Sequence, residues 1–105
     1  MQYMKAAVII PHYNDSLRLR KCLYALVPQC TNDVEVVVVD NNSSENLSLI
    51  MRDFPSIRIV IEKVKGAGAA RNRGVSETTG DILCFIDSDC IPGNDWVSKA
   101  TSLYD

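Results

Sequence analysis

The sequence of 105 residues has few of the features that define several large protein classes. It has no long apolar run, since the longest, residues 6–10 and 36–39, are far too short to cross a bilayer. It has no basic run, and 11 Lys and Arg against 13 Asp and Glu give a net charge of −2, which argues against a nucleic-acid partner. Internal repeats and flexible linkers are absent. With 47% apolar and 23% charged residues, the composition fits one ordinary globular domain.

The sequence also lacks a cysteine pattern for zinc. The four cysteines, at positions 22, 30, 84 and 90, form no CxxC pair, and a single histidine cannot complete a zinc-finger motif. Because the N-terminus has no apolar signal segment, we expect a cytoplasmic protein whose cysteines are reduced thiols. We expect His12, a lone histidine in a loop, to be a surface residue without a catalytic role.

Short apolar runs alternate with amphipathic segments along the chain. Strands are predicted at residues 6–10, 34–39, 57–61 and 82–86. Helices are predicted from a cap at Asp15 or Ser16 to Pro28, and over residues 44–52, 66–78 and 94–104. Because the strands are apolar and alternate with helices, we predict an α/β fold with a doubly wound, mainly parallel sheet of about four strands.

Apolar positions at helical spacing predict which side of each helix faces the core. Ser43 or Ser44 is expected to cap the second helix, and Gly80 to follow the third as its C′ residue. The expected buried residues are Leu19, Cys22, Leu23 and Leu26 in the first helix, Leu47, Ile50 and Met51 in the second, and Trp96 and Tyr104 in the last.

Polar residues gather directly after the predicted strands. Residues 11–15 follow the first strand, 40–43 the second, 66–73 the third and 87–89 the fourth. Because parallel strands end at one edge of a sheet, we expect all four segments on the same rim, where open α/β sheets bind ligands.

Asp87-Ser88-Asp89 is the most informative of these segments. Two carboxylates two residues apart offer hard oxygen ligands to Mg²⁺ or Mn²⁺. An isolated motif of this kind is more often a turn, because Asp and Ser favour turns. Its place on a rim with three other polar segments favours a metal site.

The other three segments suit a nucleotide. Tyr13 offers a ring that could stack on a base. Asp40 can accept a hydrogen bond from a base N–H or a ribose hydroxyl, and Asn41 can donate and accept, although this segment could simply cap a helix. The glycines that open the third helix let the backbone approach an anion, and Arg71 beside them is either solvated or a phosphate ligand. The third glycine of a dinucleotide fingerprint is missing, which excludes nicotinamide cofactors.

In order and spacing, four blocks of the sequence resemble family-2 glycosyltransferases with the GT-A fold, and together they cover essentially the whole chain. The blocks are VIIPHYN at 8–14, VVVDNNS at 37–43, GAGAARN at 66–72 and GDILCFIDSD at 80–89. The resemblance implies a four-stranded parallel sheet in the order 3-2-1-4. It also implies transfer of a sugar from a nucleotide-diphosphate donor with inversion at the anomeric carbon.

The resemblance further implies ligands and residues for this site. The donor would be a UDP-sugar in the first place, or a GDP- or dTDP-sugar, and the acceptor a saccharide or a lipid-linked glycan. The implied metal ligands are Asp89 and Asp87, for Mn²⁺ or Mg²⁺. The implied donor-binding residues are Pro11 and Tyr13 at the base, Asp40 and Asn41 at the base or ribose, Arg71 at the base or diphosphate, and Asp87 at the ribose.

Two departures from the family pattern bear on this implication. Asn41 stands where many members have a second aspartate, which affects the preferred base. Family members are also much longer, so residues 1–105 would be the N-terminal, donor-binding part, without the acceptor half and without the catalytic base of an inverting transfer. The longer protein would then be a peripheral one at the inner face of the membrane.

Two alternatives remain open. The chain could be a non-catalytic nucleotide- and metal-binding remnant that self-associates through strand 82–86, an exposed apolar edge that predicts a homodimer. Phosphatases of the haloacid dehalogenase type also have a DxD motif after a strand. In those enzymes the motif follows the first strand and continues to a threonine, whereas Ile91 stands here.

Overall fold

One parallel four-stranded sheet forms the centre of the computed structural model, which describes residues 5–102. Its strands are β1 (Ala6–His12), β2 (Val34–Asp40), β3 (Arg58–Ile61) and β4 (Ile82–Phe85), in the order β3-β2-β1-β4. β1 pairs with β2 along its whole length, from Ala6 opposite Val34 to His12 opposite Asp40. The predicted fold class, parallel pairing and strand order are confirmed.

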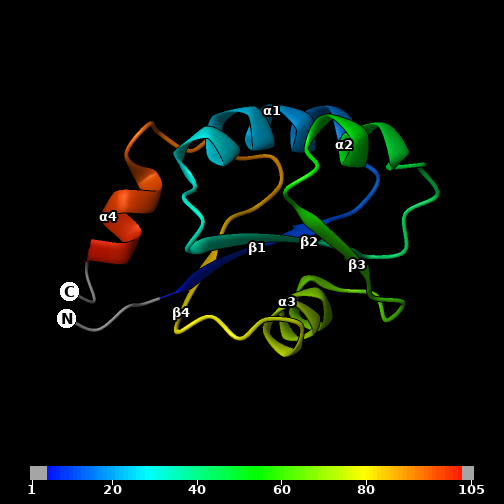
Figure 1. Cartoon of the computed structure of the whole chain (residues 1–105). Helices are drawn as coiled ribbons and strands as arrows, with labels where there is room; N and C mark the ends of the chain where they lie inside the picture. The colour runs from blue at the N-terminus through cyan, green and yellow to red at the C-terminus, as the bar shows by residue number, and fades with distance from the viewer. Residues whose placement is uncertain (1–4, 103–105) are drawn as a thin grey trace.

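Helices cover both faces of this sheet (Figure 1). α1 (Ser16–Leu26) and α2 (Ser48–Asp53) lie on one face, α3 (Ala67–Ser76) lies on the other, and α4 (Trp96–Ser102) lies at one end. A 3₁₀ helix, Val27–Gln29, follows α1 and contains Pro28. Within residues 5–102, no helix has the length and apolar character needed to cross a membrane.

Side chains of the central strands alternate between the two helical layers. Val8 and Ile10 pack in the larger core cluster under α1 and α2, whereas Ile9 packs with Val37 and Val39 on the side of α3. A strand covered on both faces must therefore be apolar at consecutive positions. Burial of each such side chain contributes about 1.5–3 kcal/mol to the free energy of folding, so the covered central strands are the main stabilising element. From α1 the core receives the four predicted residues, Leu19, Cys22, Leu23 and Leu26.

α2 departs most from its prediction. It begins at Ser48, not Ser44, and neither Ser43 nor Ser44 caps it. The backbone N–H groups of Ser44 and Glu45 donate instead to Oδ1 of Asn14, at 2.9 and 3.2 Å. These bonds hold the stretch against the turn after β1, so it is not available for a first helical turn.

The late start of α2 also changes which residues are buried. Leu47 and Ile50 are buried as predicted, but Met51 is 54% exposed, so that prediction was wrong. Phe54 takes the next core position after Ile50, and its ring packs edge-on against Tyr24 with 5.0 Å between ring centroids. Positions 47, 50 and 54 share one side of the helix, which leaves position 51 on its flank.

The end of α3 differs from its prediction as well. The helix ends at Ser76 with Glu77 as its C-cap, so Gly80 is not its C′ residue. Gly80 instead allows its backbone to lie close to β1, because a Cβ there would lie 3.1 Å from the backbone nitrogen of Ala7.

The last helix begins at Trp96, two residues later than predicted. Trp96 packs partly buried against the core, as predicted. Tyr104 lies outside the described residues.

All four cysteines are free thiols. Burial raises the pKa of the Cys22 and Cys30 thiols to about 11. These two side chains are therefore protonated near neutral pH and act as small apolar groups.

We predict that Gly74→Ala destabilises the protein, because α3 packs against the sheet at Gly74 without room for a side chain. A Cβ there would overlap Cγ2 of Ile9 and lie 3.2 Å from Cγ2 of Val39. The free energy of unfolding, measured in urea, should fall by about 1–3 kcal/mol. Gly68→Ala is the matched control, because the space around its Cβ is open, and it should change stability by less than about 1 kcal/mol. Equal stability of the two variants would contradict this packing.

Candidate active site

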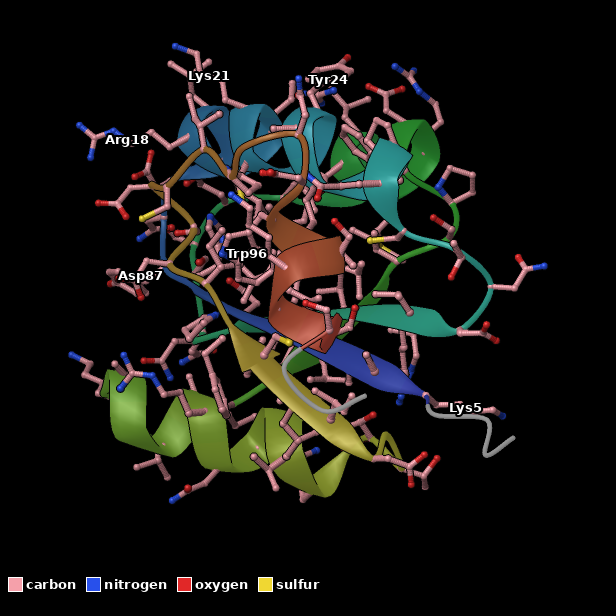
Figure 2. All side chains as sticks on the ribbon, turned by 90° about the vertical axis from the view of Figure 1, so that its left-hand side faces the viewer. Lys5, Arg18, Lys21, Tyr24, Asp87 and Trp96 are labelled. Carbon is pink, nitrogen blue, oxygen red and sulfur yellow. The ribbon has the colours of Figure 1, made fainter. Side chains whose placement is uncertain are left out.

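A cleft of about 310 Å³ lies at the carboxyl end of the strands. Asp87 and Arg18 lie at this end of the molecule, and Lys5 lies at the opposite end, before β1 (Figure 2). The residues that line the cleft come from the end of β1, which runs two residues beyond its predicted end, from the segments after β1, β2 and β4, and from the start of α3. They are Pro11, His12, Tyr13, Asp15, Asn41, Ala67, Ala70, Asp87, Ser88 and Asp89.

The structure brings together most of the residues predicted for the site. Pro11, Tyr13, Asn41, Asp87 and Asp89 all line the cleft. Tyr13 is 57% exposed, so a ligand in the cleft can reach it. The other two predicted residues, Asp40 and Arg71, lie outside the lining.

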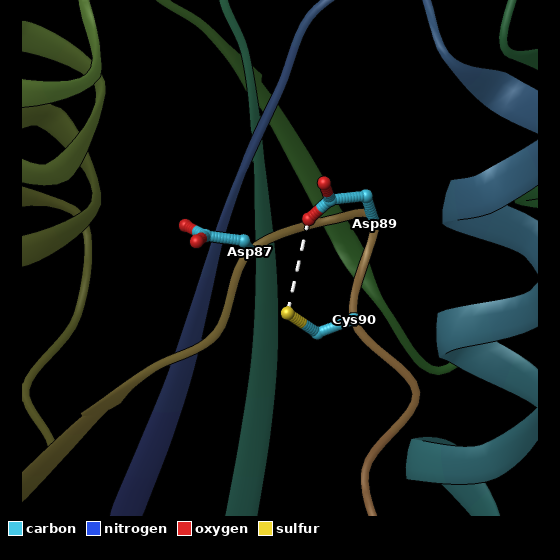
Figure 3. A group of neighbouring side chains, drawn as sticks. All are labelled: Asp87, Asp89 and Cys90. Carbon is cyan, nitrogen blue, oxygen red and sulfur yellow. Dashed lines mark hydrogen bonds between the residues drawn. The ribbon is translucent and has the colours of Figure 1, made fainter.

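Asp87 and Asp89 form an exposed acidic cluster with Cys90 in the turn after β4. Ligand atoms of the three side chains lie within 4.8 Å of one another. Asp89 and Cys90 face each other, with Cys90 Sγ 3.7 Å from Asp89 Oδ1 (Figure 3). Desolvation raises the pKa of the Cys90 thiol, and the negative charges of Asp89 and Asp87 add to this effect. Two carboxylates at this spacing fit a hard divalent cation such as Mg²⁺ or Mn²⁺.

Arg71 lies beside this cluster rather than in the cleft. Its Nη2 is 3.9 Å from Asp87 Oδ1, and both side chains are well exposed. An exposed pair at this distance adds little stability, so the guanidinium is free to meet an anion. Arg71 also borders a shallow apolar depression with Phe85, Ile91 and Trp96.

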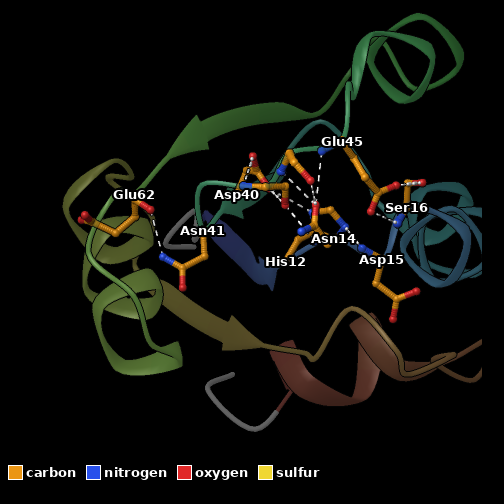
Figure 4. A network of polar contacts seen from close by, with 10 residues as sticks. His12, Asn14, Asp15, Ser16, Asp40, Asn41, Glu45 and Glu62 are labelled. Carbon is orange, nitrogen blue, oxygen red and sulfur yellow. Dashed lines mark hydrogen bonds and ion pairs between the residues drawn. The ribbon is translucent and has the colours of Figure 1, made fainter.

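His12 is buried, so the prediction that it is a surface residue was wrong. Its Nε2 accepts a hydrogen bond from the backbone N–H of Asp15 at 3.0 Å, and its Nδ1 lies 3.2 Å from Asp40 Oδ1 (Figure 4). Because Nε2 accepts, the proton of a neutral imidazole lies on Nδ1 and is donated to Asp40. The alternation of side chains along a strand could have predicted this burial, because His12 lies on the same face of β1 as the buried residues Val8 and Ile10.

Asp40 is held under the cleft by the turn that follows it. Its Oδ2 accepts from the backbone N–H of Ser43 at 3.3 Å, and its Oδ1 accepts from the Ser43 hydroxyl at 2.5 Å. The Ser43 Oγ in turn accepts from the backbone N–H of Asn14 at 2.8 Å. Asn14 and Asn42 both have positive φ, 44° and 62°, values that asparagine tolerates in tight turns. The carboxylate of Asp40 therefore joins the segments after β1 and β2.

The sequence and the structure are both similar to known glycosyltransferases. The family model described as "Glycosyl transferase family 2" matches residues 7–105. Glycosyltransferase AglE of Haloferax volcanii is 39% identical over 103 residues, which is 91% of this chain and 34% of AglE. This family match decides against the phosphatase alternative.

Two solved structures share the fold at a TM-score of 0.83. S. aureus TarS 1–349 in complex with UDP is 26% identical, and the match covers 94% of this chain and 31% of that one. Mannosyltransferase PcManGT from Pyrobaculum calidifontis, in complex with GDP-Man and Mn²⁺, is 25% identical, and the match covers 100% of this chain and 34% of that one. The chain spans about a third of the length of these relatives.

We predict that Asp40→Asn destabilises the protein although it preserves the side-chain shape. In either orientation, the new NH₂ group would face a donor, the His12 Nδ1–H or the Ser43 backbone N–H. The free energy of unfolding should fall by about 1–3 kcal/mol, the cost of an unsatisfied buried group. Asp89→Asn makes the same chemical change at an exposed carboxylate and should stay within about 0.5 kcal/mol of the wild type. An Asp40→Asn variant with the same free energy of unfolding as the wild type would show that the buried network adds no stability.

Proposed function

Since the chain belongs to glycosyl transferase family 2, we propose that its cleft binds a nucleotide-diphosphate sugar, the donor in the transfer of a sugar to an acceptor hydroxyl. The observation that carries this proposal is the pairing, in one cleft, of an open aromatic wall at Tyr13 with the exposed carboxylates of Asp87 and Asp89. Such a site offers one surface to a flat base and another to a charged diphosphate.

The base and ribose would lie along the wall formed by the end of β1 and by the segments after β1 and β2. Pro11 and Tyr13 provide apolar and aromatic surface, and Asn41 lines the cleft next to them. Asp40 supports this wall from beneath through its bonds to His12 and Ser43. We favour UDP as the nucleotide, with GDP and dTDP as alternatives. Among the similar structures, TarS was solved with UDP and PcManGT with GDP-Man.

The diphosphate would lie between the acidic cluster and the start of α3. Asp89, with Asp87, would hold Mn²⁺ or Mg²⁺, and Asp87 would also reach the ribose. When bound, the ion would offset the negative charge that builds up on the diphosphate leaving group. Arg71, 3.9 Å from Asp87, brings a guanidinium to the same place and adds positive charge for the phosphates.

An inverting transfer also needs a base to take the proton of the acceptor hydroxyl. Of the carboxylates that line the cleft, Asp87 and Asp89 form the proposed metal site, and Asp15 lies beside Arg18, at 3.6 Å. We therefore place the base and the acceptor site, for a saccharide or a lipid-linked glycan, in a longer protein of which residues 1–105 are the donor-binding part. The chain alone should bind the donor without transferring the sugar.

Calorimetric titration of the chain with UDP, GDP and dTDP, each with and without Mn²⁺, tests the donor site. We predict metal-dependent binding of at least one nucleotide, because Asp89 and Asp87 would hold the ion and its positive charge would favour the diphosphate. Asp89→Asn should weaken that binding by at least about 10–100-fold, the cost of disturbing even an indirect metal contact. Asp95→Asn is the control, since Asp95 is exposed, pairs with Lys99 and lies outside the cleft. Failure of all three nucleotides to bind would contradict the proposal.

The second candidate function is a non-catalytic module that self-associates through β4. Among the described strands, β4 pairs with β1 alone, so its other edge presents unpaired backbone groups. Phe85 on this strand is 43% exposed. A second copy could extend the sheet at this edge.

Light scattering after size-exclusion chromatography tests this association. We predict a dimer for the wild type and a shift to monomer for Phe85→Lys, because a lysine on an edge strand opposes pairing. Leu49→Lys, a change at a side chain 55% exposed on α2, should leave the dimer intact. A monodisperse wild-type monomer whose β4 amides exchange freely would rule out the association.

A further inference from the structure

The carboxamide of Asn41 is bound on both its donor and its acceptor side by one segment of backbone. Its Nδ2 donates to the carbonyl of Glu62 at 2.9 Å (Figure 4) and to that of Val64 at 2.7 Å, and its Oδ1 accepts from the N–H of Gly66 at 2.9 Å. Asn41 is only 9% exposed. Both amide hydrogens are therefore used inside the protein, and neither remains to recognise a base.

The segment that Asn41 holds, residues 62–66, connects the end of β3 to the start of α3. The N–H of Glu62 donates to the carbonyl of Asp40 at 2.9 Å, and beyond that residue the segment leaves the sheet. It ends at Gly66, whose φ of 120° is one that residues with a side chain rarely adopt. α3 begins at the next residue, Ala67, which lines the cleft. The bonds of Asn41 thus fix where one wall of the cleft begins.

Only an amide side chain can make this set of bonds. An aspartate at position 41 could accept from Gly66 but could donate to neither carbonyl. Its negative charge would also face the carbonyl oxygens of Glu62 and Val64, which repel it. The choice of asparagine over aspartate is thereby explained by the backbone around it, without reference to the base.

We propose that Asn41 is a positioning residue for the donor nucleotide. It holds residues 62–66 so that Gly66 and the first turn of α3 meet the ligand, and it does not select the base. This inference rests on the proposed function, because it assumes that the cleft binds a nucleotide.

The test compares three variants with the wild type in two measurements. Asn41→Asp removes the two donors and adds a charge. Asn42→Asp, at the exposed neighbour, adds the same charge without touching the segment. Gly66→Ala leaves Asn41 intact and disturbs the segment by its backbone angle alone, since the space around its Cβ is open. The measurements are the exchange rate of the backbone amide hydrogen of residue 66 by NMR and the dissociation constants of UDP, GDP and dTDP with Mn²⁺.

We expect Asn41→Asp and Gly66→Ala to weaken every nucleotide that binds by a common factor of about five- to thirtyfold, the effect of losing one or two hydrogen bonds. Both variants should also exchange the backbone amide of residue 66 faster, and the nucleotides should keep their order of affinity. Asn42→Asp should leave the exchange unchanged and the affinities within about twofold.

Three results would overturn the inference. The first is a changed order of nucleotide affinity in Asn41→Asp, which would make Asn41 a direct reader of the base. The second is an unchanged nucleotide affinity in a folded Asn41→Asp variant whose amide at residue 66 exchanges faster, which would leave Asn41 a purely structural role. The third is an unchanged exchange rate of Gly66, which would show that Asn41 does not hold the segment. Binding of no nucleotide by the wild type is a separate outcome, because it contradicts the proposed function itself.

Discussion

The parallel pairing of β1 with β2 is the interaction on which both the core and the cleft depend. Its register places Val8 opposite Val36 and Ile10 opposite Val38 in the middle of the sheet. The same register brings His12 opposite Asp40 at the end of the sheet, so their buried hydrogen bond continues the order of the strands. The site therefore begins where the backbone hydrogen bonds between β1 and β2 end, on segments whose positions this pairing fixes.

Much of this architecture could be predicted from the sequence because its signals are local. A strand buried on both faces must be apolar at every position, and runs such as residues 36–39 meet this requirement wherever they lie in the chain. The order of strands and helices then requires polar segments to meet at one rim. Tyr13, Asp87 and Asp89, which follow β1 and β4, lie at the cleft as that rule predicts, because their neighbours in sequence decide where they lie.

The remaining errors concern polar side chains whose partners are distant in sequence. The start of α2 depends on Asn14, about thirty residues earlier, which binds backbone groups that a first helical turn would have used. His12 is buried because Asp40 lies opposite it. Asp40 and Asn41 are adjacent, yet one turns to Ser43 and the other to residues 62–66. No local pattern predicts the partners of Asn14, Asp40 and Asn41, because each depends on which nearby donor or acceptor has no other partner.

The two helical layers differ greatly in how much side-chain volume anchors them. α1 and α2 rest on a broad cluster of large aliphatic and aromatic residues, whereas the buried residues of α3 are Ala70 and Gly74 alone. Because little side-chain volume lies between α3 and the sheet, the position of this helix depends on the close approach of its backbone at Gly74. A ligand that touches both walls of the cleft would join this thin layer to the thicker one, so binding of the ligand and packing of α3 would stabilise each other by mass action.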